Sequence, residues 1–293
     1  MDFVKIILMK LMLVVGIALI SSTVGQFEGG RVCPRSLSEI RNFAPVYFRD
    51  DSLGDLCKFD MVIIDPDNYT KREIYKLKKL GTMPIAYLNV GEIEEYRDYM
   101  DTLDPSIALS PDPNWNRRYF ADICDTLWLK LMEKRVHTII ADGFCGVYAD
   151  FSGLLKEYPD LESCSVSLIR KIKSWIGDAH LVVNAEPAII DQLGNVVDGI
   201  CVEGLIGQYD FDSDSYIKNS DKSIDSLIEC YSRLAREFRF VIFDIEYASP
   251  FDLSGRHSII SSISKAGFIP YVGTIELDTL FFDSIRHIGK KSR

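Results

Sequence analysis

Histidine is scarce in this chain of 293 residues: only four are present, and none stands in an HxH or HExxH pattern. Metal-dependent hydrolases built on barrel folds usually gather several histidines, so this class is disfavoured. The chain also lacks a GxSxG motif, which together with the shortage of histidine argues against a serine triad. We therefore expect neither a metal nor a cofactor.

Glycine-rich phosphate loops are absent as well, since neither GxGxxG nor GxxxxGK[ST] occurs. An open, doubly wound nucleotide-binding sheet would carry such a loop after an early strand. Excess positive charge is also lacking, because 33 basic residues stand against 43 acidic ones, a formal net charge of −10. This balance argues against nucleic acid or an anionic membrane as the main partner, whereas a neutral or cationic substrate is compatible with it.

Long apolar runs are limited to one stretch near the N-terminus. The apolar run Leu11–Ile20 follows two lysines and precedes the small residues of Thr23–Gly25. Ten residues match the core of a signal peptide, whereas a membrane-spanning helix needs about 20. We expect residues 1–25 to be a signal peptide, residues 26–293 to form one domain, and the mature protein to be secreted without stable membrane insertion. An uncleaved anchor is the alternative.

The seven cysteines form no CxxC pair and no zinc-finger spacing. Cys145 and Cys201 fall inside expected strands, where a free cysteine behaves as a small hydrophobic residue. Export would allow the outer cysteines to pair, Cys33 with Cys57 for example, and the sequence leaves the pairing open.

Eight short apolar runs of strand composition alternate with stretches of helical spacing. Near-continuous apolar runs suit strands that are buried on both faces of a parallel sheet. The expected strands cover residues 45–50, 61–67, 84–92, 146–151, 181–186, 199–204, 240–248 and 269–274. The longer helices are expected over Thr70–Gly81, Tyr119–Val136, Cys164–Gly177, Ser223–Phe238 and Gly255–Gly267. Eight alternations over roughly 240 residues predict a (β/α)8 TIM barrel.

Acidic residues stand where most of these strands end. All strands of a parallel barrel point their carboxyl ends to one face, where barrel enzymes hold their active sites. The acids are Asp65, Glu92, Asp150, Glu186, Glu203 and either Asp244 or Glu246. One such acid often only caps the next helix, but acids at most strand ends indicate a carboxylate-lined mouth. Glycoside hydrolysis needs only two carboxyl groups, and tyrosines 47, 87, 148, 247 and 271 with Trp115 would either stack on sugars or pack the barrel.

Five segments at the expected strand ends carry a family resemblance. They are IAYLNVGEIEEYRDY (85–99), GFCGVYADF (143–151), VNAE (183–186), VDGICVEGL (197–205) and DIEYA (244–248). In their order and spacing they resemble glycoside hydrolase family 114, the endo-α-1,4-polygalactosaminidases, over residues 43–283.

The resemblance implies a secreted barrel enzyme that cleaves an α-1,4-linked, galactosamine-containing polysaccharide, which is cationic where its amines are free. It implies an acid pair at the ends of the fourth and sixth strands, which falls on Asp150 and Glu203, and we expect Asp150 to be the nucleophile and Glu203 the general acid/base. A separation of about 5 Å between their carboxyl groups would indicate retention, and about 6.5–9.5 Å inversion. The residues expected along the sugar subsites are Asp65, Glu92, Arg97, Tyr148, Asn184, Glu246 and Tyr247. A catalytically inactive carbohydrate-binding barrel and a barrel hydrolase acting on another glycan stay open.

Overall fold

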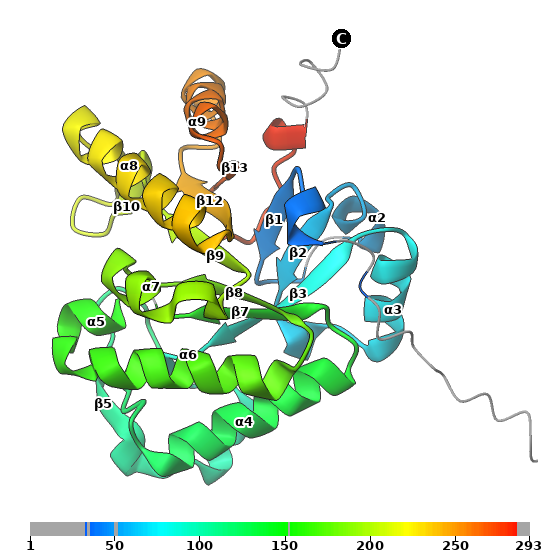
Figure 1. Ribbon diagram of the computed structural model, residues 1–293, viewed down its shortest axis with the longest axis vertical. Helices are drawn as coiled ribbons and strands as arrows, with labels where there is room; N and C mark the ends of the chain where they lie inside the picture. Colours follow the sequence, from blue (N-terminus) through cyan, green and yellow to red (C-terminus); the bar gives the residue numbers. More distant parts are fainter. Residues whose placement is uncertain (1–32, 34–35, 50–51, 152, 286–293) are drawn as a thin grey trace, which may run out of the picture. The chain divides into compact units, whose positions relative to one another are not determined.

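Eight parallel strands form one sheet whose strand order follows the chain, and the sheet curls into a nearly closed barrel (Figure 1). The strands are β1 (Phe43–Val46), β2 (Met61–Ile64), β3 (Met83–Asn89), β7 (Gly146–Asp150), β8 (His180–Asn184), β9 (Gly199–Glu203), β12 (Val241–Tyr247) and β13 (Ile269–Gly273). Neighbours pair in parallel from β1 to β13. The predicted (β/α)8 barrel is confirmed.

This computed structural model describes Cys33 and residues 36–49, 52–151 and 153–285, which fall within one compact unit, residues 32–293. The expected signal segment, residues 1–25, lies outside the described residues. No helix in the described part of the chain is long and apolar enough to span a membrane.

Aromatic side chains fill the barrel interior where its first and last strands meet. The ring of Phe43 on β1 lies 5.1 Å from that of Phe243 and 6.1 Å from that of Tyr271 on β13, measured between ring centroids. All three side chains are fully buried. Tyr271 also directs its hydroxyl to backbone, donating to the carbonyl of Thr279 and accepting the N–H of Phe281. These contacts bring the two edge strands together.

Helices follow the strands and cover the outside of the sheet. They are α2 (Leu53–Leu56), α3 (Lys71–Lys79), α4 (Thr126–Ala141), α5 (Leu154–Glu157), α6 (Glu162–Ile176), α7 (Pro187–Leu193), α8 (Asp221–Phe238) and α9 (Leu253–Ala266). The five predicted helices are present, and α4 and α6 run side by side outside β7 (Figure 1). The prediction was wrong for the start of α4, because Asp125 caps that helix and accepts the N–H of Leu127.

Two small antiparallel sheets sit in the loops after barrel strands, and neither was predicted. After β3 the chain forms β4 (Glu92–Glu94), β5 (Ala108–Pro111) and β6 (Arg118–Ala121), in the order β4-β6-β5. After β9 it forms the hairpin of β10 (Gly207–Asp210) and β11 (Ser215–Lys218). Strands of three or four residues give too short an alternation to be recognised in sequence.

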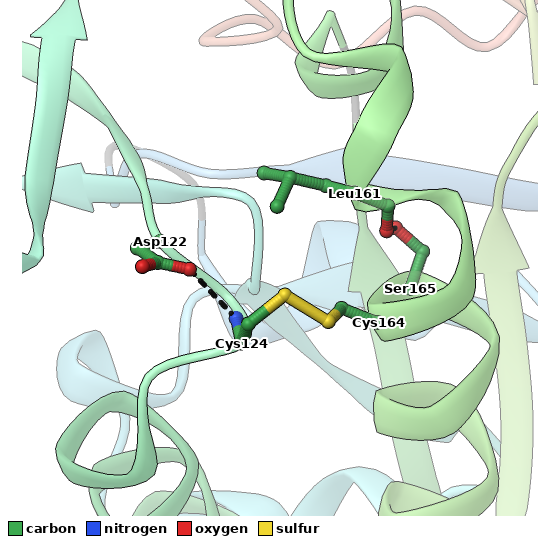
Figure 2. The surroundings of a disulfide bond; sticks show 5 residues. All are labelled: Asp122, Cys124, Leu161, Cys164 and Ser165. Carbon is green, nitrogen blue, oxygen red and sulfur yellow. Dashed lines mark hydrogen bonds between the residues drawn. A yellow bond between two sulfur atoms is a disulfide. The ribbon is translucent and has the colours of Figure 1, made fainter.

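One disulfide is present among the described residues, between Cys124 and Cys164 (Figure 2). It links the turn before α4 to the first turn of α6, the two helices that flank β7. The pairing of Cys33 with Cys57 was wrong, and both are free thiols. The Cys33 thiol lies against Cys145 and the Cys57 thiol against Thr82, so the fold places these two cysteines in different surroundings.

Candidate active site

Three polar residues stand at the ends of three neighbouring strands. Asp150, Asn184 and Glu203 are the last residues of β7, β8 and β9. Asp150 is paired in register with Asn184, and β8 pairs with β9 on its other side. Because the strands are parallel, the three side chains emerge at the same, carboxyl-terminal mouth of the barrel.

The amide of Asn184 connects the two acids. Its nitrogen donates a hydrogen bond to Asp150 Oδ1 at 3.2 Å and another to Glu203 Oε1 at 3.0 Å. Because both oxygens contact one nitrogen, they lie no more than about 6 Å apart. The two carboxyl groups therefore face each other at the mouth of the barrel.

Glu203 is surrounded by hydrogen-bond donors on two sides. The hydroxyl of Tyr148 donates to its Oε1 at 2.8 Å, and the hydroxyl of Tyr247 donates to its Oε2 at 2.7 Å. Burial raises the pKa of Glu203, the negative charge of Asp150 raises it further, and the two hydroxyls partly offset the rise, giving a pKa of about 7. A carboxyl group with that pKa exists in both protonation states near neutral pH.

Asp150, the other acid of the pair, is buried and accepts hydrogen bonds. Its side chain is buried, and the hydroxyl of Tyr87 on β3 donates to Oδ2 at 3.3 Å. Since Asn184 donates to the other oxygen, the carboxylate is held by donors from both neighbouring strands. A cavity of about 310 Å³ beside Glu203 and Asn184 is also lined by residues of the loops after β7, β8 and β9 and of the helices outside them.

Glu92 lies in the segment that follows β3 at the mouth of the barrel. It begins β4, is buried, and accepts hydrogen bonds from the side chains of Asn89 at 2.7 Å and Arg118 at 3.4 Å. Burial, followed by a hydrogen bond with the Asp112 carboxyl group, raises the pKa of Glu92 to about 9. The raised pKa favours the protonated form of Glu92 at neutral pH, and Glu92 links the sheet of β4, β5 and β6 to the loop that contains Asp112.

Asp65 and Arg97 are brought together in an ion-pair network. Arg97 is buried and binds Asp65 Oδ1 at 2.8 Å, Asp67 at 2.7 Å and Glu94 at 2.7 Å. The network joins the turn after β2 to the small sheet of β4, β5 and β6 that follows β3. Asp67 therefore contributes to this network, which fixes the shape of the mouth.

Glu246 points to the opposite side of β12 from Tyr247, because successive side chains on a strand alternate. Its carboxylate accepts the backbone N–H of Ile206 at 2.9 Å and of Gly207 at 2.6 Å. Burial and these amides act in opposite directions on Glu246, and its pKa is about 7. Asp244 lies buried beside it, and burial followed by the charge of Glu246 raises the pKa of Asp244 well above its usual value. Glu246 thus holds the loop that follows Glu203.

An aromatic contact joins two loops that sequence reasoning did not connect. Trp115, between β5 and β6, and Phe211, in the β10–β11 hairpin, have ring centroids 5.5 Å apart. The guanidinium of Arg118 backs the ring of Trp115 at 5.1 Å, and Phe211 is 40% exposed. Trp115 had been noted as a sugar-stacking residue, but no local signal points to Phe211, because its partner lies almost 100 residues earlier in the chain.

Within the described part of the chain, no three metal-binding side chains of the types His, Cys, Asp and Glu lie together in a way that could hold an ion. Glu186, the acid after β8, is exposed and lines the cavity beside Glu203. The site is therefore built from Asp150 and Glu203, the amide that joins them, and three tyrosine hydroxyls that donate to them.

Comparison with solved structures finds the same barrel fold in other proteins. The glycoside hydrolase domain of PelA from Pseudomonas aeruginosa matches with a TM-score of 0.74 and 19% identity, covering 82% of this chain and 97% of that domain. Ega3 from Aspergillus fumigatus, solved in complex with galactosamine, matches with a TM-score of 0.64 and 17% identity, covering 81% of this chain and 91% of that one. Likenesses at this level of identity establish the fold.

Sequence comparison extends the relationship to bacteria and archaea. An uncharacterized protein of Methanocaldococcus jannaschii is 26% identical over 257 residues, covering 76% of this chain and 72% of its own length. One of Deinococcus radiodurans is 26% identical over 240 residues, covering 77% of this chain and 76% of its own length. The model of the glycoside hydrolase family GH114 matches residues 42–287, most of the chain. The protein therefore belongs to glycoside hydrolase family GH114.

Proposed function

We propose that this protein uses two of its own carboxyl groups to hydrolyse an α-1,4-linked, galactosamine-containing polysaccharide. The observation that carries the proposal is the pairing of Asp150 and Glu203 at adjacent strand ends through the Asn184 amide. Two facing carboxyl groups are the minimum requirement for glycoside hydrolysis. Family membership supports the reaction class.

In this proposal Glu203 is the general acid/base and Asp150 the nucleophile. The raised pKa of Glu203, about 7, supports a proton donor at neutral pH. Asp150 attacks the anomeric carbon while the glycosidic bond breaks, and Glu203 gives its proton to the departing oxygen. Glu203 then takes a proton from water, which attacks the same carbon and releases Asp150.

The distance between the acids supports retention of anomeric configuration. Their oxygens lie no more than about 6 Å apart, and retaining glycosidases place the two carboxyl groups about 5–5.5 Å apart. Inverting enzymes leave about 6.5–9.5 Å, so that water fits between acid and sugar. Tyr148, Tyr247 and Tyr87 orient the acids by hydrogen bonds.

The substrate assignment follows from charge and from a structural relative. The chain carries a formal net charge of −10, which favours a polymer bearing free, protonated amines. Ega3, which shares the fold, was solved with galactosamine. We propose that Trp115 and Phe211 contact the sugar chain, and that Asp65, Arg97 and Glu246 shape the groove by holding its loops.

The test is product release from a partly deacetylated α-1,4-galactosaminogalactan by the protein without residues 1–25, beside its Glu203→Gln variant. Cleavage by the parent and a loss of at least about 10²-fold in the variant support the proposal. Equal cleavage by both would discard Glu203 as the acid. Binding of the polymer without cleavage by either would favour a carbohydrate-binding barrel.

We further propose that residues 1–25 direct export and are removed. The apolar run of ten residues and the small residues after it support this proposal. Expression of the full chain followed by N-terminal sequencing of protein from the medium tests it. A new N-terminus near Gln26 is expected, and retention of the intact chain on the membrane would contradict it.

A further inference from the structure

Glu186 is an exposed acid two residues after the end of β8. It stands at the N-cap position of α7, yet its side chain makes no capping hydrogen bond. No ion pair of its carboxylate is seen among the residues that the structure describes. Glutamate is also not one of the residue types that N-caps prefer. Helix capping and ion pairing therefore give no structural reason for a carboxylate at this position.

The cavity of about 310 Å³ beside Glu203 connects Glu186 with the candidate active site. Glu186, Glu203 and Asn184 all line this cavity, and its other lining residues are mostly apolar. Glu203 and Asn184 are half-buried rather than closed off from solvent. Ligand pockets in proteins have volumes of about 300–1,000 Å³, so a cavity at the lower end of this range suits a ligand as small as one sugar unit.

The charge of Glu186 acts across this cavity. Tyr231 on α8 lines the same cavity, and burial raises the pKa of its hydroxyl. The negative charge of Glu186 raises the pKa of Tyr231 further. Since charges interact more strongly beside apolar surface than in bulk water, a carboxylate here attracts a cationic group of a ligand.

The cavity lies on the side of the leaving group. Glu203 lines it, whereas Asp150 is not among the described residues that do. In the proposed reaction Glu203 gives its proton to the departing oxygen, while Asp150 bonds to the anomeric carbon of the other sugar. The sugar that carries the departing oxygen therefore lies on the side of Glu203.

We propose that Glu186 is a specificity-determining residue that binds the protonated amine of the sugar on the leaving-group side of the cleaved bond. The ligand chemistry is an amino sugar in its free, cationic form. An N-acetylated sugar would lose this contact, because its amide carries no charge. The inference rests on the proposed glycosidase function.

The test compares Glu186→Gln with the parent on two α-1,4-linked oligosaccharides that are each cleaved at a single bond. They differ only in the sugar on the leaving-group side, which is galactosamine in one and N-acetylgalactosamine in the other. The variant is expected to lower kcat/KM about three- to tenfold on the first, because the partly solvated charge pair is lost. On the second, kcat/KM should be unchanged.

Two controls separate this contact from other effects of the substitution. Asp178→Asn removes the same charge from an exposed acid before β8, at the opposite end of the barrel, and should leave both rates as in the parent. An aryl α-galactosaminide keeps only the sugar on the Asp150 side. Parent and Glu186→Gln should therefore cleave this aryl glycoside equally well.

Parent-like kcat/KM of Glu186→Gln on the oligosaccharide with the free amine would overturn the proposal. An equal or larger loss on the N-acetylated substrate would also overturn it, because the lost contact would then not involve the amine. If the parent cleaves neither oligosaccharide, the proposed function fails, and calorimetric titration with both decides the role of Glu186. Weaker binding of the free-amine oligosaccharide only would support the contact, while equal or absent binding would refute it.

Discussion

Asp150 and Glu203 lie on either side of β8 and accept hydrogen bonds from the same side-chain nitrogen, that of Asn184. The two carboxyl groups are also coupled through their charges, because the negative charge of Asp150 contributes to the raised pKa of Glu203. Their different surroundings give the pair an asymmetry that acid/base catalysis requires.

Replacing Glu203 by Gln should separate the two halves of the reaction. Cleavage of the polymer should fall by at least about 10²-fold, because the departing sugar needs a proton. An aryl glycoside whose leaving group needs no proton should still react and leave a glycosyl group on Asp150. Mass spectrometry of the intact protein measures that adduct. Asp150→Asn is the control and should show none; an adduct on that variant would contradict the assignment of the nucleophile.

The rate should fall as pH rises above neutrality. Glu203 has a pKa of about 7 and donates a proton only below it, so kcat/KM on the oligosaccharide should drop about tenfold per pH unit well above pH 7. The measurement is a pH–rate profile between pH 5 and 9. An aryl glycoside with a good leaving group should show a smaller drop in bond cleavage. A flat profile on the oligosaccharide would be incompatible with Glu203 as the acid.

The folded state should be less stable at alkaline pH. The pKa values of Glu92 and Glu203 are raised to about 9 and about 7, so the folded protein binds more protons than the unfolded chain above about pH 4.5. Stability therefore falls as pH rises through this window. Thermal midpoints at pH 5, 7 and 9 measure the effect. In the Glu92→Gln variant, whose amide still donates to Asp112, the fall in the thermal midpoint between pH 7 and 9 should be smaller than in the parent. An equal fall in parent and variant would contradict the contribution of Glu92.

Removing the disulfide should destabilise the protein without changing the barrel. Cys124 and Cys164 are separated by 40 residues, and loss of a bridge of this length costs about 2–4 kcal/mol of unfolding free energy. Denaturant unfolding of the double variant with both cysteines replaced by Ser measures this cost. Cys230→Ser is the control, since Cys230 is free. If reducing agent left the unfolding curve of the parent unchanged, the bridge would not be formed in solution.

Trp115 and Phe211 should contribute to the cleavage of long polysaccharide chains but not to that of short oligosaccharides. Trp115→Ala or Phe211→Ala should raise KM for the polymer about three- to tenfold, because sugar faces stack on exposed rings. A short oligosaccharide that occupies only the central subsites should be cleaved as by the parent. Tyr75→Ala, on the outer helix α3, is the control. Equal KM values on the polymer for all three variants would show that Trp115 and Phe211 do not bind the polysaccharide.

Much of the fold could be read from the chain because the evidence for it is local. Buried parallel strands need continuous apolar residues, and all eight runs of this kind became barrel strands. The acids that end β7 and β9 could be found in the same way, since parallel strands carry their last residues to one face. The short strands β4 to β6 and the β10–β11 hairpin could not, because three or four residues carry no periodic signal.

The sequence by itself determined the barrel, its family and the two strand ends that carry Asp150 and Glu203. Tertiary structure decided which of the other acids join them, because alternate residues of a strand face opposite sides and the chain does not mark which side is inward. Tyr247 therefore contacts Glu203, while the adjacent Glu246 binds a loop. Pairing of Cys124 with Cys164, contact of Trp115 with Phe211, and burial of the Tyr47 hydroxyl all depend on residues brought together from distant segments, which only the folded chain specifies.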